Sequence, residues 1–388
     1  MTPTTMTTKH HPLEEIAPAT VITAREHLEE VVAELHQEPR LAIDTESNGF
    51  YAYQEKVCLL QISSAREDFI LDPIAVSDLS ALGELMADPR IEKVFHAGEY
   101  DVLCLKRDYD FTFANLFDTM IAGRLLGAKE LGLAAAIRIN FGVTLSKKLQ
   151  RADWGLRPLS EAHLKYAQLD THYLLRLSEI LKTQLHENGR EADAVEACAR
   201  LAELEPVIRS FDPEGFWRLA RRNQLTDRQL ACLREIVLMR EKRAKSLDRA
   251  PFRIMSEELM VRLAAEMPDS AETLAKVKGM TPYLLRKFSD ALLEALERGR
   301  QAPPPVEPPR TSLRRSNKER RLFEVLRRWR KEQAEREAVE PVVILDTTSL
   351  QEIARAAAAG EPDPLAALSE LKRQRYGEAL LKLVHPKA

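Results

Sequence analysis

The chain has 388 residues, a net charge of −3 and a hydrophobic content of 45%. This composition excludes a protein that is disordered throughout, and the length allows two or three domains with their own cores. The sequence has no run of about 20 apolar residues that could span a membrane. Its four cysteines form no C-x-x-C pair and its polar N-terminus has no signal-peptide core, so we expect a cytoplasmic protein without a membrane anchor.

The first half of the chain mixes two kinds of pattern. After a polar stretch at residues 1–12, which we expect to be a flexible tail, short apolar runs predict strands. These runs alternate with stretches of helical spacing, which indicates a mixed sheet flanked by helices, an α/β domain, over residues 13–200. The predicted strands cover residues 41–45, 57–63, 69–71 and 91–95.

Carboxylates follow two of these predicted strands. Asp44 and Glu46 lie at the end of the first one, and side chains two residues apart on a strand point to the same face. Asp101 comes shortly after the strand at 91–95, on a stretch that is compatible with a helix. We therefore expect these carboxylates to converge beside one edge of the sheet.

A further carboxylate is predicted on a helix. Leucines near helical spacing predict one helix over residues 161–177, which places Tyr166 and Asp170 one turn apart on the same face. Hard divalent cations prefer oxygen ligands, and three or four convergent carboxylates suit a pair of such ions. Together the acidic motifs predict a two-metal phosphodiesterase site.

Each motif alone is common, whereas their order and spacing are specific. Asp101 follows Asp44 by 57 residues, and Asp170 follows Asp101 by 69. The combination resembles the DEDD superfamily of 3′-5′ exonucleases, in the subgroup with Tyr in the third motif, and more closely the ribonuclease D family. Tyr100 departs from the family pattern, in which an acidic residue often stands there. Further similar segments are VCLLQIS at 57–63, KVFHAG at 93–98, FDTMIA at 117–122 and DWGLRPL at 153–159.

The resemblance implies a fold and an activity. It implies a ribonuclease H-like sheet and an exoribonuclease that removes nucleotides from RNA 3′ ends as 5′-monophosphates, with tRNA precursors as substrates. The implied cofactors are two divalent cations, Mg²⁺ with Mn²⁺ as the alternative. In the implied scheme Asp44, Glu46 and Asp170 hold the ion that activates water, and Asp44 and Asp101, directly or through water, hold the ion that stabilises the leaving 3′ oxygen. Tyr166 would orient the water, and family resemblance favours a monomer.

A basic segment precedes the third motif. Between residues 144 and 157, four Lys or Arg residues surround a tryptophan, a combination that suits phosphate contact and base stacking. The alternative is an ordinary solvated loop. The expected RNA-binding residues, including two beside the other motifs, are Lys147, Lys148, Arg151, Trp154, Arg157, Gln61 and His96.

The rest of the chain predicts helices only. The segments at 251–256 and 341–346 both begin with proline and are offset by 90 residues, which suggests a repeated unit. By resemblance the repeats are HRDC domains, small all-α modules, over residues 210–300 and 311–388. The proline-rich residues 301–310 would form a stiff linker between them.

Two alternatives to an exoribonuclease remain from the sequence. A DNA-directed 3′-5′ exonuclease would use the same acids, and a catalytically inactive RNA-binding scaffold would need only the basic surfaces. The Arg-rich stretch at 314–336 can bind RNA or form a solvated helix face. A helicase is disfavoured because the sequence has no G-x-x-x-x-G-K-[ST] loop.

Overall fold

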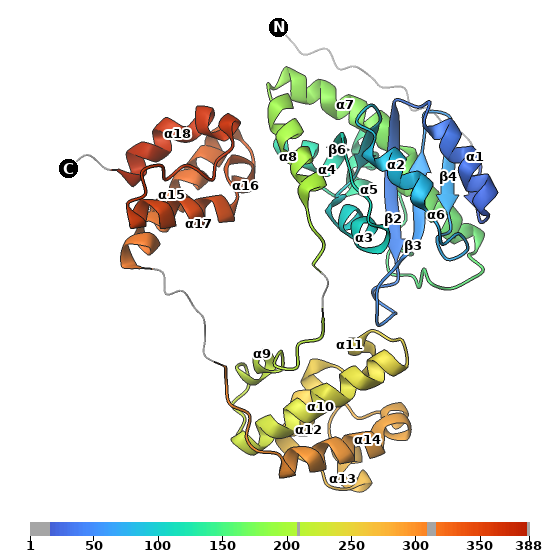
Figure 1. Ribbon diagram of the computed structural model, residues 1–388, viewed down its shortest axis with the longest axis vertical. Coiled ribbons are helices and arrows are strands. Elements are labelled where there is room, and N and C mark those ends of the chain that lie inside the picture. Colours follow the sequence, from blue (N-terminus) through green and yellow to red (C-terminus); the bar gives the residue numbers. More distant parts are fainter. Residues whose placement is uncertain (1–15, 208–209, 309–315, 386–388) are drawn as a thin grey trace. The chain divides into compact units, whose positions relative to one another are not determined.

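The computed structural model describes residues 16–207, 210–308 and 316–385 (Figure 1). The predicted tail at 1–12 lies outside the described residues. The chain divides into two compact units. The first unit takes its described residues from 1–46, 57–206 and 312–388, and the second takes them from 47–56 and 207–311. Among the described residues, no helix has the length and apolar character needed to cross a membrane.

A six-stranded mixed sheet forms the centre of the α/β domain, with the strand order β1-β4-β3-β2-β5-β6. Strand β3 pairs antiparallel with β4, whereas the pairs β1–β4, β2–β5 and β5–β6 are parallel. The mixed sheet is therefore confirmed. The strands are β1 (Thr20–Ile22), β2 (Arg40–Ser47), β3 (Val57–Ser63), β4 (Asp68–Leu71), β5 (Glu92–Phe95) and β6 (Leu116–Asp118).

The two outermost strands, β1 and β6, were not predicted. Each has three residues, which is too short for an alternating pattern to stand out from the background. Pairing with an already formed neighbour fixes them instead, β1 along β4 and β6 along β5. Tertiary context, which a local pattern does not carry, therefore sets both edges of the sheet.

Helices cover both faces of this sheet (Figure 1). Strand β2 shows why, because Leu41 and Ile43 join one apolar core while Ala42 joins the other. Helices α1 (Arg25–Leu35), α2 (Ser80–Ala87) and α3 (Glu99–Tyr109) contribute to the first core. The other helices of this domain are α4 (Thr119–Leu125), α5 (Leu133–Phe141), α6 (Glu161–His172), α7 (Leu174–Glu187) and α8 (Glu191–Glu203).

The predicted helix over residues 161–177 is wrong in its length, because two helices occupy that range. Helix α6 ends at His172 and α7 begins at Leu174. Tyr173 lies between them, with φ −94° and ψ −9°, and ends one helix while beginning the next. Tyr166 and Asp170 both lie on α6, so their predicted spacing of one turn is retained.

Two helical modules follow the α/β domain. The first module packs around one apolar core in the second unit, and the second module has a core of its own. The helices of the first module are α9 (Trp217–Ala220), α10 (Asp227–Ser246), α11 (Pro251–Ile254), α12 (Glu257–Glu266), α13 (Ala271–Lys276) and α14 (Pro282–Gln301). Those of the second are α15 (Asn317–Glu337), α16 (Pro341–Ile344), α17 (Thr347–Ala359) and α18 (Glu370–Val384).

The modules share one design at an offset of 90 residues. In each, a long helix is followed by a single helical turn that begins with proline and then by a capped helix. The equivalent arginines make equivalent bonds, since Arg240 donates to the carbonyl of Met255 and Arg330 donates to the carbonyl of Leu345. The repeat inferred from the proline-led segments is therefore present in the structure.

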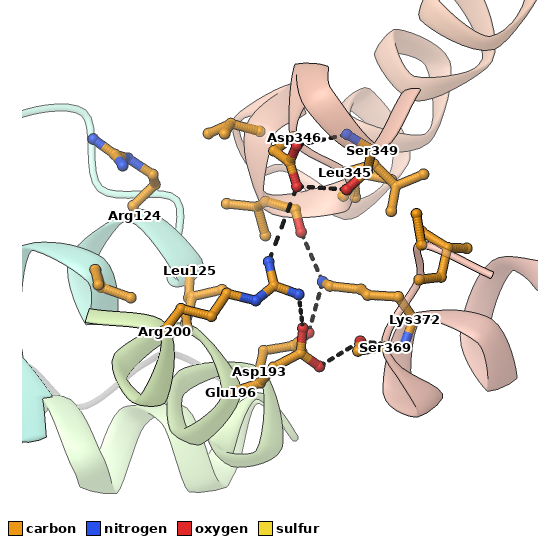
Figure 2. A pocket seen from close by; sticks show the side chains of 17 residues that line it. Arg124, Leu125, Asp193, Glu196, Arg200, Leu345, Asp346, Ser349, Ser369 and Lys372 are labelled. Atoms are coloured by element: carbon orange, nitrogen blue, oxygen red, sulfur yellow. Dashed lines mark hydrogen bonds and ion pairs between the residues drawn. The ribbon is translucent and has the colours of Figure 1, made fainter. Parts of the chain in front are cut away.

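The second module packs on helices α4 and α8 of the α/β domain, an arrangement that the sequence did not predict. Asp193 of α8 is 2% exposed and accepts hydrogen bonds from Lys372 at 2.9 Å and from Arg375 at 2.5 Å. Ser369 donates to Glu196 at 2.7 Å. A cavity of about 200 Å³ lies beside these pairs (Figure 2). Charges from both partners line it, so this interface is ionic as well as apolar.

Candidate active site

Three carboxylates meet where β2 and α6 come together. Asp44 and Glu46 lie on β2, and Asp170 lies on α6. One carboxylate oxygen from each lies within 4.8 Å of the corresponding oxygens of the other two. Within the part of the chain that the structure describes, this is the one such group of His, Cys, Asp and Glu that could hold a metal ion. The i, i+2 geometry of the strand therefore aims both of its acids at α6, as expected.

Asp101 is held beside this cluster by the strand itself. It lies in the first turn of α3 and is only 6% exposed. Its carboxylate accepts two hydrogen bonds from Thr45, one from the backbone N–H at 3.0 Å and one from the hydroxyl. Thr45 stands between the two strand acids, so these bonds fix the position of Asp101 relative to both of them.

The electrostatics of the cluster are unfavourable without cations. Burial raises the pKa of Asp44 well above its usual range, and the charges of Asp101, Asp170 and Glu46 raise it further. Burial, followed by the charges of Asp170 and Asp101, raises the pKa of Glu46 to about 9. Burial is also the main reason why the pKa of Asp170 rises to about 7 and that of Asp101 to about 6.

These pKa values test whether the residues fit a metal. Crowded carboxylates with little access to water stay protonated unless positive charge compensates them. Hard divalent cations prefer oxygen donors, and Asp44, Glu46 and Asp170 each offer a carboxylate oxygen. The donor set thus fits divalent cations.

Tyr166 lies one turn before Asp170 on α6 and keeps its proton. Burial raises the pKa of its phenol, and the charges of Asp170, Glu46 and Asp44 act in the same direction. A neutral phenol can donate or accept a hydrogen bond, but it is a poor general base near neutral pH. The residue is therefore suited to orienting a group near the carboxylates.

Three of the expected RNA contacts, Trp154, Arg157 and Gln61, are buried or paired inside the domain, and their contact with RNA stays a prediction. Trp154 is 1% exposed and packs on Tyr166 at a centroid distance of 5.9 Å, so its ring offers no free face to a base. Arg157 binds Asp72 at 2.6 Å and 2.7 Å. Gln61 is fully buried in β3. Sequence alone could not separate an exposed tryptophan from one that supports the catalytic helix.

The other expected RNA contacts are three exposed cations and one partly buried histidine. Lys147, Lys148 and Arg151 are exposed on the loop before α6. His96 is partly buried, and its Nδ1 lies 2.9 Å from the Thr119 hydroxyl. Burial lowers the pKa of His96, which favours the neutral ring. These four residues remain predictions.

Two residues that position parts of the site, Thr45 and Asp118, were not predicted from the sequence. Thr45 bonds Asp101, and Asp118 accepts a hydrogen bond from the Gly98 amide at 2.7 Å just before α3. Asp118 also caps α4 through the Met120 amide at 2.8 Å. Their sequence signal was present in the motifs D-T-E and F-D-T, where a polar residue stands beside a ligand or at a strand end.

Comparisons with known proteins agree with this geometry. Residues 19–186 match the family described as 3′-5′ exonuclease, and residues 229–296 and 319–384 each match the HRDC domain. Ribonuclease D of Granulibacter bethesdensis is 30% identical over 369 residues, covering 94% of this chain and 92% of that protein. The chain belongs to the ribonuclease D family.

Other relatives of the family extend the comparison. The crystal structure of Escherichia coli RNase D, described as an exoribonuclease involved in structured RNA processing, has a TM-score of 0.66 and 25% identity. The match covers 94% of this chain and 98% of that one. Exosome complex component 10 of Rattus norvegicus is 30% identical over 302 residues, which is 76% of this chain. The chain spans only 34% of the length of that relative.

Proposed function

We propose that this member of the ribonuclease D family is a metal-dependent 3′-5′ exoribonuclease that releases 5′-monophosphates. The observation that carries the proposal is the convergence of Asp44, Glu46 and Asp170, with oxygens within 4.8 Å of one another, beside Tyr166. A scaffold that only binds RNA has no physical need for buried, mutually repelling carboxylates, because they cost stability unless cations compensate them. The cluster therefore favours hydrolysis over passive binding.

In the proposed site, Asp44, Glu46 and Asp170 hold one divalent cation, and Asp44 and Asp101 share a second. When bound, the two cations lower the pKa of water and offset charge on the attacking and leaving oxygens. Tyr166 orients the attacking water through its neutral hydroxyl. Thr45 holds the carboxylate of Asp101 in place during this reaction, because both of its hydrogen-bond donors point at that group.

We assign the finer features of the function on the same basis. The cations are two Mg²⁺ ions, with Mn²⁺ as a substitute, and the substrates are tRNA precursors. The protein acts as a monomer in the cytoplasm, where its four buried cysteines, which form no disulfide in the structure, would stay reduced. The nuclease domain covers residues 13–200, and the HRDC domains cover 210–300 and 311–388.

In this proposal, two basic surfaces bind the RNA. Lys147, Lys148 and Arg151 are exposed on the loop that leads into α6 and can contact phosphates near the scissile end. Helix α15 buries Leu326 and Trp329, and its exposed arginines include Arg321, Arg327 and Arg328. Arg314 lies outside the described residues.

A direct test is incubation of the protein with a 3′-tailed tRNA precursor, with and without EDTA. Products are sized at nucleotide resolution. We expect the wild type to shorten the RNA stepwise from the 3′ end, and EDTA to stop this reaction. The variant Asp170→Asn should not shorten the RNA, because it loses one ligand charge. A single-stranded DNA of matched sequence tests the alternative substrate. If this DNA is digested faster than the RNA, the proposed substrate is DNA and not RNA.

A further inference from the structure

The chain leaves the metal-binding strand in an unusual way. Residues 47–56 are the last residue of β2 and the connection from β2 to β3, yet they belong to the same compact unit as the first helical module. The family match to the exonuclease domain covers residues 19–186 and includes this segment. A piece of the nuclease sequence is thus packed as part of an HRDC module.

Tyr53 is the main anchor of this segment. Its ring packs against the apolar core of the first module, and its hydroxyl donates a hydrogen bond to Glu241 of α10. The backbone N–H of Tyr53 donates to Asp248 at 3.1 Å. The hydrogen bond to Glu241 raises the pKa of Tyr53 to about 12, so the hydroxyl keeps its proton and donates throughout the neutral range.

Three further contacts come from the turn at 247–253, which joins α10 to α11 and includes the first residues of α11. The Ala250 amide donates to the carbonyl of Tyr51 at 2.9 Å. Arg253 donates to the carbonyl of Phe50. The guanidinium of Arg253 also lies over the Tyr51 ring, 3.7 Å from its centroid, a cation–π distance. The turn at 247–253 therefore binds backbone and side chains of the segment together.

The corresponding turn of the second module has an equivalent role. At the offset of 90 residues it covers 337–343, and it packs on the α/β domain. Glu337 accepts a hydrogen bond from Arg190, and Glu340 pairs with Arg124 at 3.1 Å. Val343 joins the apolar core of the α/β domain. Both repeats thus use the same turn to bind nuclease sequence.

We propose that the turn at 247–253 is a docking surface that holds residues 50–53 and, through them, positions Glu46 for metal binding. Tyr53 and Arg253 are positioning residues in this arrangement. Glu46 is the last but one residue of β2, and the chain beyond the end of a strand is mobile unless something fixes it. The proposal rests on the function proposed for the acidic cluster, because it deepens the assignment of Glu46 as a ligand.

The test compares Tyr53→Phe and the double variant Tyr53→Phe/Arg253→Ala with the full-length wild type. Tyr283→Phe is the matched control, because it removes a hydroxyl from the same module, one that accepts from Arg249 at 3.3 Å. Binding of Mn²⁺ is followed by electron paramagnetic resonance. Single-turnover hydrolysis of a trinucleotide RNA is measured in parallel. The rate on so short a substrate does not depend on RNA binding by the helical modules.

We expect the double variant to bind Mn²⁺ about 10-fold more weakly, with a similar loss of rate at limiting metal, and Tyr53→Phe to show part of this loss. Saturating metal should restore most of the rate, a rescue that general destabilisation would not give. Tyr283→Phe should match wild type. Unchanged Mn²⁺ affinity in both Tyr53 variants would overturn the proposal. If wild type itself neither binds Mn²⁺ nor hydrolyses RNA, the function proposed for the cluster fails instead.

Discussion

Replacing Asp193 by Asn tests whether ionic pairing holds the second helical module on the nuclease domain. Asp193 lies on α8, is 2% exposed, and receives Lys372 and Arg375 from α18. Arg190 approaches the same carboxylate at 3.5 Å. Asn has nearly the same shape but no charge. The substitution therefore removes the counter-charge and leaves the packing otherwise intact.

The distances set the size of the expected effect. Two unit charges 2.9 Å apart attract by about 6 kcal/mol at an effective dielectric constant of 20, and desolvation of both groups offsets much of that gain. Removal of one partner from a buried pair typically costs about 3–5 kcal/mol, because the remaining charge stays buried without compensation. We expect Asp193→Asn to fall at the lower end, since the amide still accepts one hydrogen bond.

Hydrogen exchange measures this loss at the interface. Amides of α8 and α16 should exchange about 100-fold faster in Asp193→Asn, which corresponds to roughly 3 kcal/mol. Glu191→Gln is the control on the same helix, because the Glu191 side chain is 61% exposed and its loss should change exchange little. Exchange at wild-type rates in both helices of Asp193→Asn would refute the reasoning.

The pH dependence of this pairing has a definite sign. Burial would raise the pKa of Asp193, but hydrogen bonds from Arg375 and Lys372 outweigh it and lower the pKa below its usual value. A carboxylate with a lowered pKa stabilises the folded state above its unfolded pKa, about 3.9, and loses this contribution as the pH falls through the folded pKa. The difference between wild type and Asp193→Asn should therefore shrink below about pH 4.

Other predictions concern catalysis, metal and RNA. Tyr166→Phe should lower the single-turnover rate by about 10- to 10⁴-fold with unchanged Mn²⁺ affinity, and an unchanged rate would remove its assigned role. Because the raised pKa values of Glu46, about 9, and Asp170, about 7, let the metal-free fold bind extra protons, its stability should fall as the pH rises from about 4 to 9. Divalent cations displace these protons, so the gain in melting temperature on adding Mg²⁺ should be larger near pH 9 than near pH 6, and an equal gain would contradict the assignment. Lys148→Ala should weaken RNA binding and reduce the salt slope by about one, as binding curves over a salt series would show; an unchanged slope would mean that this lysine contacts no phosphate.

The acidic site could be predicted from sequence because its geometry is local. Asp44 and Glu46 share a strand face whatever surrounds them, and Tyr166 and Asp170 share a helix face. The break between α6 and α7 at Tyr173 did not disturb this, since both residues precede it. Side chains two residues apart on a strand, or four apart on a helix, share a face even where the predicted length of the element is wrong.

Burial and docking were not predictable in the same way. Trp154 follows lysines and an arginine, a composition that suits an exposed loop, but its ring is buried under Tyr166 and His163. Asp193 looks like any acid in the first turn of a helix, and only contact with a segment almost 180 residues later shows that it is buried and paired. Such long-range partners leave no periodic signal along the chain.

The division of the nuclease sequence between two compact units was equally hidden. Residues 47–56 lie between two predicted strands and would ordinarily be a simple connection. Tyr53 and Tyr51 find their partners about 190 to 200 residues away in the chain. The repeat offset of 90 residues could be recognised in the sequence. That both repeats use the same turn for docking is known only from the contacts in the structure.

The most direct test of the central claim is the identity of the first product released from a short, defined single-stranded RNA in the presence of Mg²⁺. Mass spectrometry of early time points should detect the 5′-monophosphate of the 3′-terminal nucleotide and an RNA shortened by one residue. EDTA, Asp44→Asn and Asp170→Asn should each abolish both species. Internal fragments, a 3′-phosphorylated product, or undiminished release by Asp170→Asn would contradict the account.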